Sequence, residues 1–288
     1  MARRPADTGR VEAYGTWSRR TSPEPLAVLN ALQSLCCDPK TNLPESLKVR
    51  KNLPSMPLNG PLFDCKDPAV WRKVYEKYWQ VVELKSVGKG KKHGKLLPLD
   101  KWYQEELPAA IAGRSERFLT QPELVKLMEW KLTRGKFRPR LQQLVASNSS
   151  ETVERCTRKA FSLLPDVTAA ITELSSLKAL GPATASAVLA AGAPDQAAFM
   201  ADEAVESIPS LRPIQYTAKH YSLYLQKVVE LTQALNKVDS EQDWTPHRVE
   251  QCLWAWAVAG QLQPSLLQES CGEETETSKP PAKRQKIK

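Results

Sequence analysis

Apolar side chains recur every three to four positions along most of the chain, which is the spacing of one face of an α-helix. The pattern is first clear over residues 67–84. Its apolar face consists of Val70, Trp71, Val74, Tyr75 and Tyr78. Asp67 followed by Pro68 predicts the start of this helix, because aspartate caps free amides and proline is tolerated at the first helical position.

Further helices are expected along the chain, each bounded by capping or turn residues. They cover residues 99–114, 119–135, 139–148, 149–164, 166–177, 216–238 and 245–260. We expect Asp100 to cap the first of them, and Thr120 with Glu123 to form a capping box on the second. Thr245 and Pro246 predict the start of the last. Strand patterns are almost absent, so the sequence predicts an all-α fold of about ten short helices.

Composition divides the chain into three parts. Residues 1–60 are rich in Pro, Arg, Ser and Asn, and we interpret them as a loosely ordered N-terminal arm. Residues 61–262 are the predicted helical domain, interrupted by a Lys- and Gly-rich loop at 85–99. Residues 263–288 turn polar and predict a disordered tail.

The net charge of the chain indicates which kind of partner it would bind. The chain has 41 Lys and Arg against 32 Asp and Glu, a net charge of +9. This excess favours an acidic partner such as nucleic acid. We expect neither a membrane segment nor a secretory signal, because no long apolar run occurs. The six cysteines form no Cys-x-x-Cys pair, and we expect no metal or other cofactor.

Residues 173–192, ELSSLKALGPATASAVLAAG, place a Gly-Pro turn between two helical patterns. The apolar positions around the turn are Leu174, Leu177, Leu180, Ala185, Val188 and Leu189. Gly181 would leave the backbone exposed where the second helix begins. The amides of Gly181, Ala183 and Thr184 would then bind a phosphate at the positive end of the helix dipole. The alternative is a helix corner with no ligand.

Residues 177–185 resemble the helix-hairpin-helix DNA glycosylase superfamily, whose pattern is roughly Leu-x-Gly-apolar-Gly-x-x-Thr-Ala. Ala179 stands where the first glycine of that pattern usually is. The superfamily has a catalytic aspartate about twenty residues beyond the hairpin, and here Asp202 follows Gly181 by 21 residues. The resemblance implies a glycosylase-like all-α fold over residues 61–262, with the hairpin at 170–191.

The resemblance also implies chemistry. Asp202 would polarise a water molecule and stabilise positive charge on the sugar as a base departs. Bifunctional members carry a lysine where this chain has Ala183, so β-lyase activity by that route is not expected. The residues after the aspartate also differ from the usual pattern, being Glu203 and Ala204. The alternative for Asp202 is a helix N-cap without a catalytic role.

The segment at 131–140 gathers basic residues around an aromatic ring. The basic residues around Phe137 are Lys131, Arg134, Lys136, Arg138 and Arg140. The last four of them would extend a phosphate-binding surface. The alternative is a solvated helix end whose cations complement the helix dipole. Tyr216, by contrast, belongs to a stripe that we interpret as core or groove wall.

The C-terminal basic cluster predicts a nuclear localisation signal. It consists of Lys283, Arg284, Lys286 and Lys288. The alternative is a nonspecific attraction of this cluster to nucleic acid. The sequence therefore predicts a monomeric nuclear protein that binds DNA, with RNA as an open alternative, and a nuclear import receptor. It would be a monofunctional DNA glycosylase acting through Asp202. The alternative is a non-catalytic nucleic-acid-binding or helical protein-interaction module.

Overall fold

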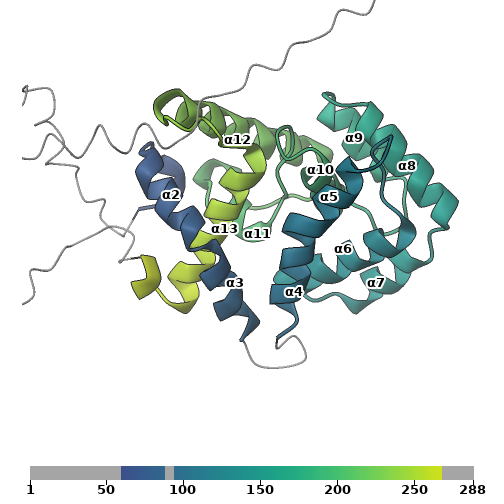
Figure 1. Cartoon of the computed structure of the whole chain (residues 1–288), viewed down its shortest axis with the longest axis horizontal. Coiled ribbons are helices and arrows are strands. Elements are labelled where there is room, and N and C mark those ends of the chain that lie inside the picture. The colour runs from purple at the N-terminus through teal and green to yellow at the C-terminus, as the bar shows by residue number, and fades with distance from the viewer. Residues whose placement is uncertain (1–59, 88–93, 268–288) are drawn as a thin grey trace, which may run out of the picture. The chain divides into compact units, whose positions relative to one another are not determined.

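The regular structure is helical throughout the part of the chain that a computed structural model describes, residues 60–87 and 94–267 (Figure 1). The prediction of an all-α fold is confirmed for these residues. No helix among them is both long enough and apolar enough to cross a membrane. Nearly all of the predicted arm at 1–60, and the tail beyond residue 267, lie outside the described residues.

The helices follow one another with short connections. In chain order they are η2 (Leu62–Asp64), α2 (Pro68–Glu76), α3 (Tyr78–Ser86), α4 (Leu96–Lys101), η3 (Trp102–Glu106), α5 (Leu107–Ala112), α6 (Gln121–Arg134), α7 (Pro139–Ala146), α8 (Ser150–Ser162), α9 (Val167–Leu174), α10 (Pro182–Gly192), α11 (Asp202–Glu206), η4 (Pro209–Leu211), α12 (Ala218–Val238) and α13 (Pro246–Leu262).

Several helix starts lie where the sequence predicts them. The Thr120 side chain accepts a hydrogen bond from the Glu123 amide, and Glu123 accepts one from the Thr120 amide, which completes the capping box of α6. Asp67 caps α2 and Thr245 caps α13 through their side chains. These signals are local, so the sequence alone is sufficient to find them.

Three expectations about residues 67–114 were wrong. The helix over 67–84 is two helices, α2 and α3, which meet at Lys77. The loop at 85–99 is shorter than expected, since α3 reaches Ser86 and α4 begins at Leu96. Asp100 is no cap: it lies inside the continuous helical stretch from α4 to α5 and is fully buried. Its carboxylate is satisfied by side-chain donors from other helices rather than by free amides.

Two helices organise the packing. Helix α13 contacts α2, α3, α11 and α12, and helix α10 contacts α5, α6, α9 and α12 (Figure 1). The α10 segment 183–191 consists mostly of alanine and is buried along its whole length. Small side chains allow neighbouring helices to approach closely on all sides. Helices α6, α10, α11 and α13 together surround the candidate site.

A buried ion pair joins α6 to α13. Arg134 donates to both carboxylate oxygens of Glu250, at 2.8 and 3.4 Å, and the two residues are 1% and 0% exposed. The Arg134 guanidinium carbon also lies 4.2 Å from the centre of the Trp254 ring. Burial raises the pKa of the Glu250 carboxyl to about 7, because its loss of hydration outweighs the attraction of Arg134.

Hydrogen bonds around this pair connect further helices, and Asp100 lies next to the pair, with its Oδ1 4.0 Å from Arg134 Nε. Asp100 accepts from the Tyr78 hydroxyl and the Trp130 indole, each at 2.7 Å. Gln104 donates to Tyr78 and also bonds His247, one turn before Glu250 on α13. Burial and the positive charge of Arg134 lower the pKa of His247 to about 3, so its imidazole is neutral at pH 7. The network therefore connects α3, α4, η3, α6 and α13.

The ion pair makes a prediction about stability. Arg134→Met leaves the Glu250 carboxylate without its charged partner, so we expect the free energy of unfolding to fall by about 3–5 kcal/mol. Replacing both partners, as Arg134→Met with Glu250→Leu, removes the unpaired charge and should recover most of that loss. Urea denaturation followed by circular dichroism measures both. The exposed Arg138→Met is the control, and an equal loss there would contradict the prediction.

Candidate functional site

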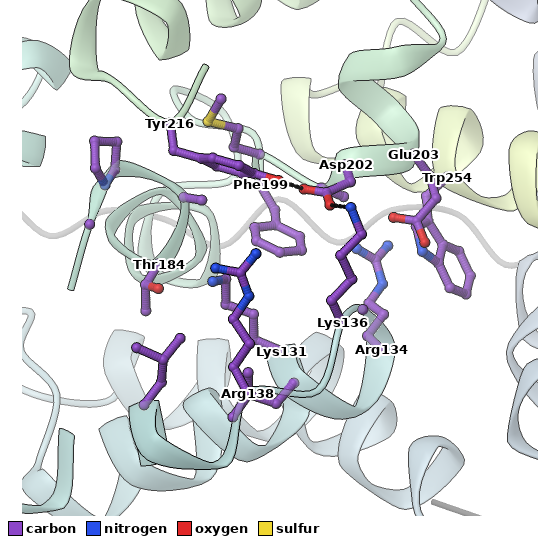
Figure 2. A pocket seen from close by; sticks show the side chains of 18 of the residues that line it. Lys131, Arg134, Lys136, Arg138, Thr184, Phe199, Asp202, Glu203, Tyr216 and Trp254 are labelled. Carbon is purple, nitrogen blue, oxygen red and sulfur yellow. Dashed lines mark hydrogen bonds and ion pairs between the residues drawn. The ribbon is translucent and has the colours of Figure 1, made fainter. Parts of the chain in front are cut away.

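One cavity of about 470 Å³ contains most of the residues that the sequence analysis singles out (Figure 2). Its wall combines the start of α10, the end of α6 and the start of α11. The lining residues that matter below are Lys85, Lys131, Arg134, Lys136, Arg138, Gly181, Ala183, Thr184, Phe199, Asp202, Glu203, Tyr216 and Trp254. Hairpin, basic segment and aspartate thus converge, although up to 71 residues separate them in sequence.

The turn between α9 and α10 has the backbone conformation that a glycine would favour. Ala179 adopts a φ of 66°, in the left-handed region, at the position where the superfamily pattern has its first glycine. Asn148, which is not part of the turn, stabilises it by two hydrogen bonds. Its side chain accepts one from the Lys178 amide and donates one to the Lys178 carbonyl. Alanine therefore occupies this position at some cost in strain, of about 1 kcal/mol.

The backbone amides at the start of α10 differ in whether they already donate a hydrogen bond within the protein. Among the described residues, the N–H groups of Gly181 and Ala183 have no hydrogen-bond acceptor, and both residues line the cavity. The Thr184 amide instead donates to the Gly181 carbonyl at 2.9 Å, so it is less available to a phosphate than the other two amides. The Thr184 side chain still lines the cavity. A β-carbon at Gly181 would meet nothing within 4 Å, so a ligand can approach this backbone.

The segment before Asp202 is fixed by hydrogen bonds from two helices. The Ser186 hydroxyl of α10 accepts from the Met200 amide at 2.9 Å. The Tyr221 and Tyr224 hydroxyls of α12 donate to the carbonyls of Ala198 and Phe199. The side chains of this segment are buried, so Asp202 begins α11 from a firmly held backbone.

Both carboxylate oxygens of Asp202 have partners. The Tyr216 hydroxyl donates to one oxygen at 2.7 Å, and the Lys136 ammonium lies 2.9 Å from the other. Figure 2 shows these two side chains reaching Asp202 from opposite sides. Asp202 is not the N-cap of α11; that position is Ala201, and no side chain caps the helix. The capping alternative is therefore wrong, and the carboxylate instead forms part of the cavity wall.

The predicted basic residues differ in how far their side chains are buried. Arg134 is buried in its pair with Glu250, so the prediction that it contacts phosphates was wrong. Lys136 and Arg138 are exposed and line the cavity. Arg140 is exposed on α7 and is not among the cavity residues, and neither is Phe137, which is 60% exposed. The residues of the predicted nuclear localisation signal lie outside the described residues.

Several contacts in the cavity wall were not predicted from the sequence. Tyr216, interpreted as core or groove wall, does line the cavity, and its hydrogen bond to Asp202 is the unexpected part. The Lys85 ammonium pairs with Glu203 at 3.0 Å and lies 5.1 Å from the centre of the Trp254 ring. These contacts join segments that are separated in sequence, and no local motif marks them.

Lys131, which the sequence marks only as one of the basic residues at 131–140, is a further candidate for chemistry. It is partly buried on α6 and lines the cavity. Burial lowers its pKa from 10.5 to about 8, the Asp202 carboxylate opposes this shift, and the Arg138 charge adds to it. In Figure 2 the Lys131 and Arg138 side chains both rise from the lower helices toward Phe199.

No protein-family model matches this chain, and neither a curated protein nor a solved structure does. The interpretation of the cavity therefore depends on its own geometry and charges.

The charges around Lys131 make a prediction about its titration. We expect Asp202→Asn to lower the pKa of Lys131 below about 8, because it removes a stabilising negative charge. Arg138→Gln should raise this pKa, because it removes a repelling positive charge. Nuclear magnetic resonance of isotopically methylated lysines, followed over pH, measures both shifts. A Lys131 signal that titrates with the surface lysines, near about 10.4, would contradict the burial of this amine.

Proposed function

We propose that this chain is a nucleic-acid-binding protein of the helix-hairpin-helix glycosylase type. The proposal places the sugar-phosphate backbone at the start of α10 and a single nucleotide, turned out of the helix stack, in the adjacent cavity. DNA is the nucleic acid we favour, on the resemblance of the hairpin sequence. The nucleus as the compartment, and an import receptor as a partner, rest on the C-terminal basic cluster alone.

The observation that carries the proposal is the convergence of three features on one cavity. Unpaired amides at Gly181 and Ala183 offer donors to an anion at the positive end of α10. Exposed Lys136 and Arg138 add positive charge at the same cavity. A volume of about 470 Å³ lies in the usual range of ligand pockets, and Phe199 and Tyr216 give it apolar surface.

Asp202 supplies the chemistry in this proposal. A carboxylate at the cavity wall would attract positive charge that develops on the sugar as the bond to the base breaks. It would also orient the water molecule that replaces the base. Ser186, Tyr221 and Tyr224 fix the backbone just before Asp202, so the position from which this carboxylate reaches the cavity is set before a ligand binds.

A non-catalytic binding role has one observation in its favour. Both oxygens of Asp202 are already engaged, by Tyr216 and by Lys136, which reduces the charge it offers to a ligand. A protein that only binds nucleic acid would use the same hairpin and the same basic residues. Binding and base release must therefore be measured separately.

The hairpin makes a prediction about binding. A duplex with a tetrahydrofuran abasic analogue should bind the native chain with an affinity that falls steeply with salt, by a log–log slope of about −0.9 per neutralised phosphate. Gly181→Asp should weaken binding by roughly tenfold or more, because its carboxylate caps the free amides and repels phosphate. Fluorescence anisotropy at several salt concentrations measures this.

Gly181→Ala is the matched control. Its β-carbon meets no atom within 4 Å and the amides stay unpaired, so binding should be nearly unchanged. Equal binding by the Asp and Ala variants would exclude the hairpin as the phosphate site.

The carboxylate makes a prediction about catalysis. If the protein releases a base from duplexes with uracil, hypoxanthine, alkylated or oxidised bases, Asp202→Asn should slow that release by about 10² or more. Its affinity for the tetrahydrofuran duplex should be kept, which distinguishes a catalytic from a binding defect. Asp195→Asn, an exposed carboxylate outside the cavity, is the control. Tight binding without release from any of these duplexes would favour the non-catalytic role.

A further inference from the structure

Three lysines line the cavity, and they differ in their partners. Lys136 is paired with Asp202, and Lys85 is paired with Glu203. The Lys131 ammonium makes no hydrogen bond or ion pair with any of the residues that the structure describes. It is also the most deeply placed of the charged groups on the α6 wall apart from Arg134, which Glu250 neutralises.

This environment makes the Lys131 nitrogen reactive. A lysine that loses hydration without gaining a carboxylate partner releases its proton more easily, and the neutral amine is a nucleophile. With its pKa at about 8, roughly a quarter of Lys131 is neutral at pH 7.5. The ion pair of Lys136 has the opposite effect and raises the pKa of that ammonium.

We propose that Lys131 forms an imine with an aldehyde held in this cavity, and that the aldehyde is the ring-opened sugar of an abasic site. The substrate class rests on the proposed function, because a phosphate bound at the amides of Gly181 and Ala183 would place the adjoining sugar beside the cavity. The hairpin position where bifunctional relatives of the superfamily carry a lysine is Ala183 in this chain. The amine here comes from a different helix, α6.

The chemistry needs no further reactant. The neutral Nζ adds its lone pair to the C1′ carbonyl carbon and forms a C–N bond. One proton passes from nitrogen to the former carbonyl oxygen, and protonation of that oxygen by the medium lets it leave as water. A protonated C=N bond then replaces the C=O bond. Asp202, whose charge acts on Lys131, lies where it would stabilise this cation.

Reductive trapping tests the proposal. The full chain is incubated with a duplex that contains a true abasic site and with sodium borohydride, and covalent complexes are counted on denaturing gels. We expect native protein to be trapped and Lys131→Arg, which keeps the charge, to be trapped at least about tenfold less. Lys219→Arg, an exposed lysine outside the cavity, should be trapped like the native chain. Peptide mass spectrometry should place the modification at Lys131.

A parallel binding assay separates this proposal from the proposed function. The tetrahydrofuran analogue has no aldehyde, so it reports binding alone. Binding without trapping, or equal trapping of Lys131→Arg, overturns the role of Lys131 and leaves the binding function standing.

A small aldehyde tests Lys131 if the chain does not bind DNA. If the chain binds no duplex, the proposed function fails and the abasic-site substrate with it. Reductive labelling with 2-deoxyribose 5-phosphate and cyanoborohydride then tests the amine itself. Labelling concentrated at Lys131 supports its role as a nucleophile, and labelling spread evenly over the lysines overturns it.

Discussion

The buried pair between Arg134 and Glu250 sets the geometry on which the cavity depends. Burying two charges is unfavourable unless they meet in good hydrogen-bonding geometry, so the pair fixes the end of α6 against the start of α13. Phe199, Trp130 and Trp254 surround the guanidinium and exclude water from it. Because Phe199 and Trp254 also line the cavity, the charge network and the cavity wall share their side chains.

Three basic residues that are close together in sequence are buried to different extents, and this difference separates their roles. Arg134 is buried and neutralised, so it is structural. Lys131, one turn earlier, is partly buried without an acidic partner, which makes it chemically available. Lys136, just beyond the helix, is exposed and pairs with Asp202 at the cavity wall. The same charge thus stabilises the fold at Arg134, and under the proposals above it would supply a reactive amine at Lys131 and attract a ligand at Lys136, according to how much water and which partner each residue retains.

The limits of the sequence analysis follow from the same physics. Thr120, Glu123 and Asp67 act on amides within three residues of themselves, so the sequence alone predicts them. Gly181 and Asp202 could be singled out because 21 residues separate them, as in the pattern that the hairpin resembles, and both line one cavity. Asp100 and Arg134 could not be predicted, because their partners lie 22 to 116 residues away and burial alone decides their roles. The contact of Tyr216 with Asp202 likewise exists only after folding.

The pair of Lys136 with Asp202 has a consequence for what the cavity would admit. A ligand that needs the carboxylate must first compete for it with Lys136, whose ammonium is more than half exposed. A neutral ligand carries no negative charge that could replace Asp202 as the partner of the Lys136 ammonium, so separating the ion pair would be unfavourable. A phosphate group supplies a replacement anion at the cavity, where the unpaired amides of Gly181 and Ala183 also favour it. The ion pair would therefore couple phosphate binding to exposure of Asp202, and so select ligands that carry a phosphate.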